Sequence, residues 1–238
     1  MTFVDLHRYF APVSKNEEPS LNLGIWGRKL GGWLDWSELL SQRRVILLAE
    51  ASSGKSEEFR NQQSVLSAQG KPAFFIRIEE LADQGFEAAL DPGSVEAFTN
   101  WRTGTAQGYF FLDSVDEARL NRKNFDTALK KFARDLGRAV ERAFVFISCR
   151  VTDWKVREDR LLIEAVLPWR EVAKEAVKDA DPLLDPIFNT EEKNQRRQVE
   201  KPKGKPGELL VVQLVPLSND QCQQLAKSLI FPRKSGHV

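Results

Sequence analysis

Residues 45–59 read VILLAEASSGKSEEF, an apolar run that leads through small residues into Gly-Lys-Ser. The pattern G-x-x-x-x-G-K-[S/T], between a buried strand and a helix, forms a loop that wraps its backbone N–H groups around phosphate. Here the eight positions run from Ala49 to Ser56, so alanine stands where the pattern has its first glycine. Taken alone, this incomplete match fits an ordinary surface turn equally well. The rest of the chain has to decide between the two interpretations.

Each position of this stretch has an expected role in a phosphate-binding loop. Alanine has the smallest side chain that could replace the first glycine, so we expect it to be tolerated. The N-terminus of the following helix adds partial positive charge. Lys55 would reach the β- and γ-phosphates of a nucleotide, and the Ser56 hydroxyl would ligate Mg²⁺. The candidate nucleotide-binding residues are Ala49, Glu50, Ala51, Ser52, Ser53, Gly54, Lys55 and Ser56.

A second candidate site follows another apolar run, in YFFLDSVDEARL at residues 109–120. A strand that delivers Asp113 to its carboxyl end, beside the loop, would supply the anchor for Mg²⁺. Asp116 and Glu117 lie just beyond, where a carboxylate can orient or deprotonate an attacking water. An acidic turn after a strand is common by itself. Its arrival about 60 residues after the lysine, with one β-unit between, favours the catalytic interpretation.

A third candidate is Arg150, at the end of the apolar run in FVFISCRVTDW, residues 144–154. On a strand between the two motif strands, this cation would lie near the γ-phosphate, where it could stabilise transferred charge or report the nucleotide state. An arginine at a strand end is usually a surface residue. Within this series of motifs, the functional interpretation is favoured.

Five short apolar runs alternate with helical or mixed stretches, at residues 45–49, 73–78, 109–113, 144–148 and 209–217. Such continuous runs suit strands that are buried on both faces of a parallel sheet. Apolar residues from Phe125 to Val140 recur every three or four positions, which is typical of an amphipathic helix. The sequence therefore predicts an α/β fold of the P-loop type, a three-layer sandwich with a mainly parallel five-stranded sheet flanked by helices.

We expect an irregular N-terminal lead-in segment over residues 1–35 and a nucleotide-binding domain over residues 36–238. Residues 155–208 break the alternation of strands and helices and are expected to form a charged insertion. The basic side chains between residues 193 and 205 could contact phosphate backbones. Four glutamates accompany them in residues 189–208, so a solvated loop is favoured.

The composition excludes several other classes of protein. A net charge of +1 gives no reason to expect a nucleic-acid or membrane partner. Two cysteines and two histidines provide neither a disulfide framework nor a histidine-based metal site. No signal-peptide pattern is present, and no apolar run approaches the roughly 20 residues of a spanning helix. We expect a soluble cytoplasmic protein.

Together these motifs resemble the nucleotide-binding domain of signal-transducing P-loop ATPases, in particular the NACHT-like branch. FFLDSVDE has the form of that family's second motif, with Ser114 where glycine is frequent. Ser148-Cys149-Arg150 has the form of its third motif, Thr/Ser-x-Arg. VQLVPLSNDQC, at residues 212–222, is similar to the L-x-P-L-S stretch that often leads into a helix. The resemblance covers roughly residues 36–230.

The resemblance implies a switch that binds ATP or ADP with Mg²⁺, hydrolyses ATP slowly, and self-associates through this domain according to its nucleotide state. In bacteria such proteins often serve in defence against phage or plasmids. Family members usually continue into a winged-helix segment and a sensor region, which we expect to be absent from this chain. The lead-in chain of such domains often covers the adenine, and Trp26 could stack there. Core packing of Trp26, Trp33 and Trp36 is nevertheless favoured.

Two alternatives stay open. The first is a non-catalytic interaction scaffold that keeps the fold, which Ala49 and the missing C-terminal segments favour. The second, less favoured, is a P-loop kinase or a GTPase. No strand ends in the Asn-Lys-x-Asp of a GTPase, and only residues 193–205 could pose as a kinase lid. The pair of acids after Asp113 points instead to activation of water.

Overall fold

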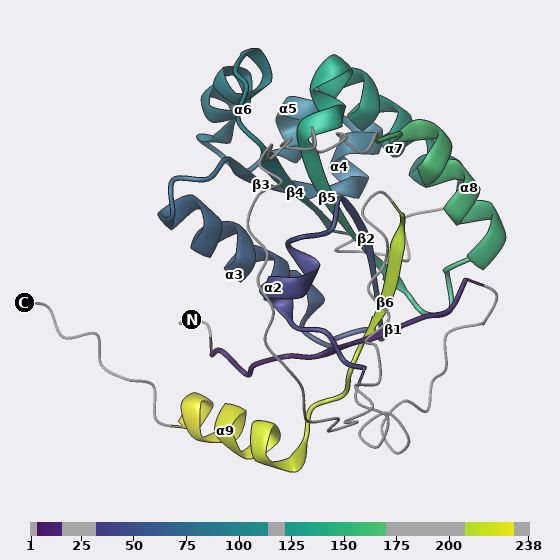
Figure 1. Cartoon of the computed structure of the whole chain (residues 1–238). Coiled ribbons are helices and arrows are strands. Elements are labelled where there is room, and N and C mark those ends of the chain that lie inside the picture. Colours follow the sequence, from purple (N-terminus) through teal and green to yellow (C-terminus); the bar gives the residue numbers. More distant parts are fainter. Residues whose placement is uncertain (1–3, 16–31, 114–121, 170–207, 231–238) are drawn as a thin grey trace, which may run out of the picture.

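A six-stranded sheet forms the centre of the computed structural model, which describes residues 4–15, 32–113, 122–169 and 208–230 (Figure 1). Its strands are β1 (Phe10–Pro12), β2 (Arg44–Ala49), β3 (Ala73–Arg77), β4 (Gly108–Asp113), β5 (Ala143–Arg150) and β6 (Leu210–Leu214). They lie in the order β1-β6-β2-β5-β4-β3. β2 to β6 are parallel, and β1 is antiparallel to β6. The prediction of an α/β fold with a mainly parallel sheet is confirmed, but the sheet has six strands rather than five.

The additional strand, β1, lies in the expected lead-in segment. Phe10 is fully buried and pairs in register with Leu214 of β6. On its other side, the backbone of Phe10 exchanges hydrogen bonds of 2.9 and 2.8 Å with Leu34. Pro12 is compatible with this position because β1 lies at the edge of the sheet, where a missing N–H is tolerated. The N-terminal segment therefore contributes an edge strand to the sheet.

Helices cover both faces of the sheet (Figure 1). They are α2 (Trp36–Leu39), α3 (Lys55–Ala68), α4 (Ile78–Asp83), α5 (Phe86–Ala89), α6 (Ser94–Thr103), α7 (Arg122–Leu136), α8 (Val156–Val166) and α9 (Asn219–Ile230), with a 3₁₀ helix over Gly137–Arg142. α2 and α3 pack on one face, and α4 to α8 pack on the other. α9 lies beyond the end of β6, beside the N-terminal segment (Figure 1).

Successive residues of the central strands enter different hydrophobic clusters. In β2, Ile46 and Leu48 face the cluster under α4 to α8, whereas Val45 and Leu47 face the cluster under α2 and α3. Side chains alternate between the two faces of a strand, so every position of such a strand is buried. This arrangement is the physical reason for the continuous apolar runs, and it confirms that the central strands are buried on both faces.

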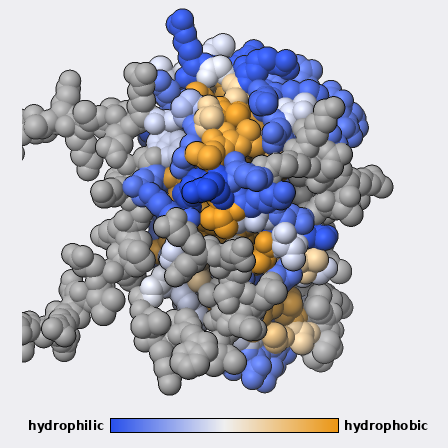
Figure 2. Space-filling view, turned by 90° about the vertical axis from the view of Figure 1, so that its right-hand side faces the viewer, coloured by the Kyte–Doolittle hydropathy of each residue, from blue (hydrophilic) through white to orange (hydrophobic). Residues whose placement is uncertain are grey.

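α8 opens the stretch that the sequence analysis assigns to a charged insertion. It packs Val156, Leu162 and Val166 against the larger core cluster, while Leu161 is 61% exposed. Figure 2 shows this side of the molecule, where apolar side chains form a band between hydrophilic patches. The basic cluster between residues 193 and 205 lies outside the described residues. Within the described ranges, no helix combines the length and apolar character needed to cross a bilayer.

A buried arginine closes the amino end of the central strands. The Arg44 side chain is 1% exposed, and its guanidinium lies 5.4 Å from the centre of the Trp169 ring. It donates hydrogen bonds to five backbone carbonyls, those of Arg43, Val140, Ala143, Leu167 and Pro168. Burial lowers the pKa of Arg44 to about 9, still above neutral pH, so the group stays charged. Arg44 therefore ties the end of α8 and the turn before β5 to the sheet.

We expect Arg44→Met to lower the free energy of unfolding by about 2–4 kcal/mol, because several buried carbonyls would lose their donor. Urea denaturation measures this loss. Arg43→Met is the matched control, since Arg43 donates one carbonyl hydrogen bond, to Glu141, from a partly exposed position. Similar losses for the two variants would contradict the role given to Arg44.

Candidate functional site

The carboxyl ends of three neighbouring strands carry the candidate residues. β5 lies between β2 and β4, with Ala49 paired to Arg150 on one side and Leu112 paired to Ile147 on the other. The expectation that the arginine-bearing strand separates the loop strand from the acidic strand is confirmed. Residues 49–56, Asp113 and Arg150 therefore share one edge of the sheet.

Residues 50–54 form the loop between β2 and α3, as the sequence predicts. The chain turns through two positions with left-handed backbone angles, Ser52 with φ of 57° and Gly54 with φ of 89°. Such a conformation is uncommon for a serine. Ala49 is 2% exposed and stays paired with Arg150, so the first position of the motif is still part of the strand. An alanine fits there because extended backbone places no special demand on the side chain.

Lys55, the first residue of α3, folds back over this loop. Its side chain is 5% exposed, and Nζ donates hydrogen bonds to the carbonyls of Glu50 (3.1 Å) and Ala49 (3.4 Å). Burial lowers the pKa of the Lys55 ammonium, Asp113 raises it, and Arg150 lowers it again. The ammonium therefore lies within electrostatic reach of both other strand ends. The structure brings Lys55, Asp113 and Arg150 together.

Asp113 is fully buried at the end of β4. Its Oδ1 accepts a hydrogen bond of 2.7 Å from Ser148 Oγ, on the neighbouring strand. Its Oδ2 is also buried and accepts no hydrogen bond from any described residue. A buried carboxylate oxygen without a donor is costly unless a cation or a solvent molecule satisfies it. This oxygen therefore fits the expected role of Asp113 in holding Mg²⁺.

The protein ligands of a magnesium site beside a nucleotide are few, because Mg²⁺ keeps several waters and uses phosphate oxygens. Ser56 is the second residue of α3 and is partly buried, one position after the lysine. No group of three acidic, histidine or cysteine side chains suited to a metal ion occurs among the described residues. A pair made of Ser56 and Asp113 requires no such group.

Several candidate residues lie outside the described part of the chain. Asp116 and Glu117 follow β4 within residues 114–121, so the structure gives no geometry for the water-activating carboxylates. Trp26 also lies outside the described ranges. Of the other tryptophans near the loop, Trp36 packs against the core cluster under α2 and α3. Its ring meets that of Phe10 edge to face, with 4.9 Å between centroids.

Sequence reasoning missed Arg8. This side chain comes from the N-terminal segment, is 6% exposed, and bridges two distant carbonyls. Its Nη1 donates to the carbonyl of Ser53 (3.1 Å) and its Nη2 to the carbonyl of Val215 (3.2 Å). The available signal is alternation, since Leu6, Arg8 and Phe10 are buried while the residues between them are exposed. Arginine in such a pattern is easily taken for a solvated residue.

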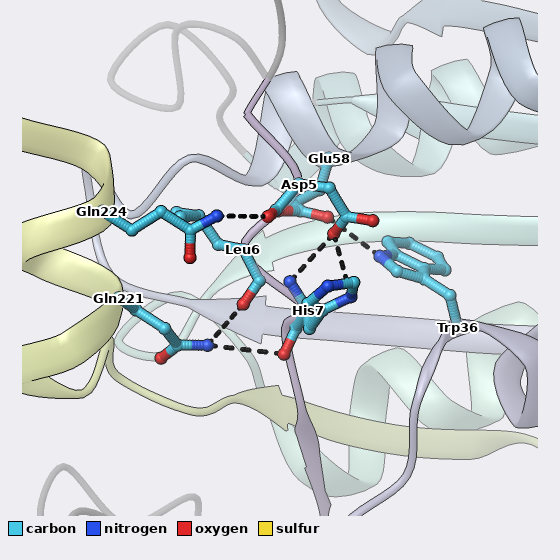
Figure 3. Close-up of polar contacts among 7 residues, drawn as sticks. All are labelled: Asp5, Leu6, His7, Trp36, Glu58, Gln221 and Gln224. Carbon is cyan, nitrogen blue, oxygen red and sulfur yellow. Dashed lines mark hydrogen bonds and ion pairs between the residues drawn. The ribbon is translucent and has the colours of Figure 1, made fainter. Parts of the chain in front are cut away.

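Glu58, one turn into α3, is a second buried charge near the loop (Figure 3). It accepts a hydrogen bond of 2.9 Å from Trp36 Nε1. Burial raises the pKa of Glu58, while the hydrogen bond from Trp36 and the charge of Arg8 lower it. Glu58 and Arg8 are therefore close enough to influence one another. Trp36 therefore anchors a carboxylate whose charge acts on Arg8.

A hollow of about 790 Å³ lies between the N-terminal segment and the start of α9. Its wall includes Tyr9, Trp33 and Val215. α9 holds the N-terminal segment in place, since the amides of Gln221 and Gln224 donate to the carbonyls of residues 5–7 (Figure 3). Residues 49–56 do not line the hollow, but Arg8 donates both to the carbonyl of Val215, in its wall, and to the carbonyl of Ser53, in the loop.

Comparison with models of protein families, with curated proteins and with solved structures finds no match for this chain. The geometry of the strand ends and the motifs themselves therefore carry the functional argument.

The ionisation of Glu58 should leave a pH-dependent mark on stability. Its pKa is raised above 4.5 in the folded protein, so ionisation is less favourable in the folded state than in the unfolded state. The free energy of unfolding should therefore fall as the pH rises from 4.5 through the folded pKa. Glu58→Gln should remove this fall, so that the free energy of unfolding of the variant rises relative to that of the wild type as the pH increases. Urea unfolding over a pH series measures the difference.

The control for this series is Glu57→Gln, which removes an exposed carboxylate from the same helix. A difference between Glu58→Gln and wild type that stays constant with pH would show that burial does not perturb Glu58.

Proposed function

We propose that this chain is a P-loop ATP-binding domain that hydrolyses ATP slowly with Mg²⁺ and acts as a nucleotide-dependent assembly switch. One observation carries the proposal. An ammonium (Lys55), a buried carboxylate oxygen of Asp113 that has no donor among the described residues, and a guanidinium (Arg150) converge at one edge of the sheet, around the loop before α3. These groups match, one for one, what a bound triphosphate and its metal ion require.

The loop supplies the contacts to phosphate. Its backbone N–H groups and the N-terminus of α3 offer donors and partial positive charge to phosphate oxygens. Lys55 hydrogen-bonds to loop carbonyls and adds a full charge next to them. In this proposal Lys55 contacts the β- and γ-phosphates, as P-loop lysines do. Arg150 lies at the end of β5 and stabilises the charge that develops on the transferred phosphoryl group.

Ser56 and Asp113 are the proposed ligands of Mg²⁺, which when bound would neutralise charge on the phosphate oxygens. Ser148 orients Asp113 through the hydrogen bond to Oδ1, which leaves Oδ2 for the ion. Asp116 or Glu117 is the proposed group that orients or deprotonates the attacking water. This last assignment is supported by the sequence motif.

The hollow between the N-terminal segment and α9, which Arg8 connects to the loop, is the proposed site for the base and ribose. Its volume of about 790 Å³ falls within the range of small-molecule sites. Tyr9 and Trp33 line it with their rings 6.0 Å apart, so aromatic surface is present for a base to contact. In this proposal Tyr9 and Trp33 contact the base, the role that the sequence analysis considers for Trp26, which lies outside the described residues.

Self-association and a role in antiviral defence are supported by the resemblance of the motifs at Asp113 and Ser148–Arg150 to NACHT-like ATPases. A nucleotide that contacts both the loop and the wall at Val215 would be sensitive to the position of the N-terminal segment and α9. Displacement of these elements is a physical route from nucleotide state to a change in surface.

The second candidate is a scaffold that binds no nucleotide or does not hydrolyse it. It is favoured by the hydrogen bonds within this region, since the Lys55 ammonium already donates to the carbonyls of Ala49 and Glu50. Ala49 also keeps its place in β2 instead of opening the loop. No described contact singles out a kinase or a GTPase.

We expect ATP to bind in the presence of Mg²⁺, and Lys55→Ala to weaken binding by about 30-fold, because a charge-assisted contact to phosphate would be lost. Isothermal titration with ATP and ADP, with and without Mg²⁺, measures both effects. Lys71→Ala, at an exposed lysine just after α3, is the matched control and should bind like the wild type. Equal affinity of Lys55→Ala and wild type would remove the loop assignment.

Asp113→Asn separates the enzyme from the scaffold. The neutral amide should abolish phosphate release and cancel the gain in affinity that Mg²⁺ gives, while ATP binding without Mg²⁺ stays near the wild-type level. Phosphate release and titration with and without Mg²⁺ measure these effects. Wild-type protein that binds ATP and Mg²⁺ yet releases no phosphate would support the scaffold instead.

A further inference from the structure

The Arg8 side chain is held in a fixed position beside the phosphate loop. It is buried, and each of its two terminal nitrogens donates to a different backbone carbonyl. The segment that carries it is fixed at the same place, since Val215 donates its own N–H to the Tyr9 carbonyl at 3.0 Å. Burial lowers the pKa of the Arg8 guanidinium, and the negative charge of Glu58 on α3 raises it. These contacts leave the guanidinium little freedom to move.

The contact with Ser53 controls the direction of the next N–H group. The described chain has no cis peptide bond, so the peptide between Ser53 and Gly54 is trans. In a planar trans peptide the C=O and N–H bonds point in opposite directions. Because Arg8 binds the Ser53 carbonyl, the Gly54 N–H points away from Arg8. The Lys55 ammonium, bonded to the carbonyls of residues 49 and 50, marks the inner side of the loop.

We propose that Arg8 is a positioning residue of the phosphate loop, which holds the Ser53 carbonyl outward and thereby aims the Gly54 N–H at bound phosphate. This inference rests on the proposed function and adds the N-terminal segment to the phosphate site. Arg8 itself acts through the peptide and is not a contact of the reacting atoms.

A loop of small residues needs such a restraint. Gly54 has no side chain, and its φ of 89° lies in a region that glycine adopts without steric penalty, so other backbone angles are also open to it. If this peptide flipped, a carbonyl oxygen would face the phosphate in place of a donor. A Cβ built on Gly54 would lie 3.8 Å from Arg8 Nη1, so the guanidinium packs directly against this part of the loop. Holding the donor in place before binding lowers the ordering cost of binding.

Arg8 should affect the phosphate part of the ligand and not the base, although it also donates to the Val215 carbonyl in the wall of the hollow. The wall of the hollow keeps its own contacts, because Tyr9 and Val215 are joined through their backbones and α9 holds residues 5–7. Loss of the guanidinium should therefore weaken contacts to phosphate and leave those to the base. A purely structural role would weaken both.

The test compares wild type, Arg8→Ala, Arg8→Lys and Lys55→Ala in titrations with ATP and Mg²⁺, with inorganic tripolyphosphate, and with adenosine. Arg8→Ala should bind ATP and tripolyphosphate about tenfold more weakly, because one oriented donor is lost, and adenosine as the wild type does. The affinity of Arg8→Lys for ATP and tripolyphosphate should lie between those of the wild type and Arg8→Ala, since a single ammonium replaces a planar group that spans two carbonyls. Thermal melting reports whether each variant is folded.

Chemical rescue gives a readout that altered packing would not produce. Methylguanidinium at millimolar concentration should restore most of the tripolyphosphate affinity of Arg8→Ala. Arg60→Ala is the matched control, because it removes a half-exposed arginine from α3 that pairs with Asp91. That variant should bind all three ligands like the wild type and should not respond to methylguanidinium.

The outcomes separate this inference from the proposed function. If Lys55→Ala loses affinity but Arg8→Ala and Arg8→Lys bind tripolyphosphate like the wild type, the positioning role is wrong and the ATP site stands. Equal losses for adenosine and tripolyphosphate in Arg8→Lys would also overturn it, since the residue would then serve the fold of the whole site. Wild-type protein that binds none of the three ligands would overturn both proposals.

Discussion

Parallel pairing of β5 with β2 on one side and β4 on the other is the constraint on which the site depends. These strands are apolar on both faces along their length, so polar side chains occur where the strands leave the core. Because all three strands run in the same direction, their carboxyl ends meet at one edge. A lysine, an aspartate and an arginine that are far apart in the chain are thereby placed around one loop. The sheet creates the site, and the loop completes it.

The two ends of the sheet handle buried charge in different ways. At the amino end, the Arg44 guanidinium is satisfied by five backbone carbonyls and needs no counterion. At the carboxyl end, Lys55 and Arg150 stand near Asp113, whose second oxygen lacks a donor among the described residues. Burial also raises the pKa of the Cys149 thiol to about 12, so that group adds no charge at neutral pH. At the amino end the buried charge is met by backbone carbonyls, whereas the carboxyl end keeps three charged side chains close together.

The sequence predicts the central strands and their ends because burial on both faces leaves continuous apolar runs. It also places Arg150 between the loop and Asp113, and the pairing of β5 bears this out. β1 escapes prediction because three residues that include Pro12 carry almost no periodic signal. The contact from Arg8 to Ser53 escapes for a different reason. It spans 45 positions of the chain and ends on a backbone carbonyl, which has no identity in the sequence.

α9 also holds the N-terminal segment through backbone carbonyls. Gln221 and Gln224 bind carbonyl oxygens, so the grip recognises the path of the main chain and not its side chains. Of that segment, Leu6, Arg8 and Phe10 point into the protein, while Asp5, His7 and Tyr9 are exposed. Evolutionary drift is therefore expected at Asp5 and His7, whereas Tyr9 lines the hollow proposed for the base and is expected to be kept. Homologous chains would therefore keep Leu6, Arg8 and Phe10, together with an aromatic side chain at position 9.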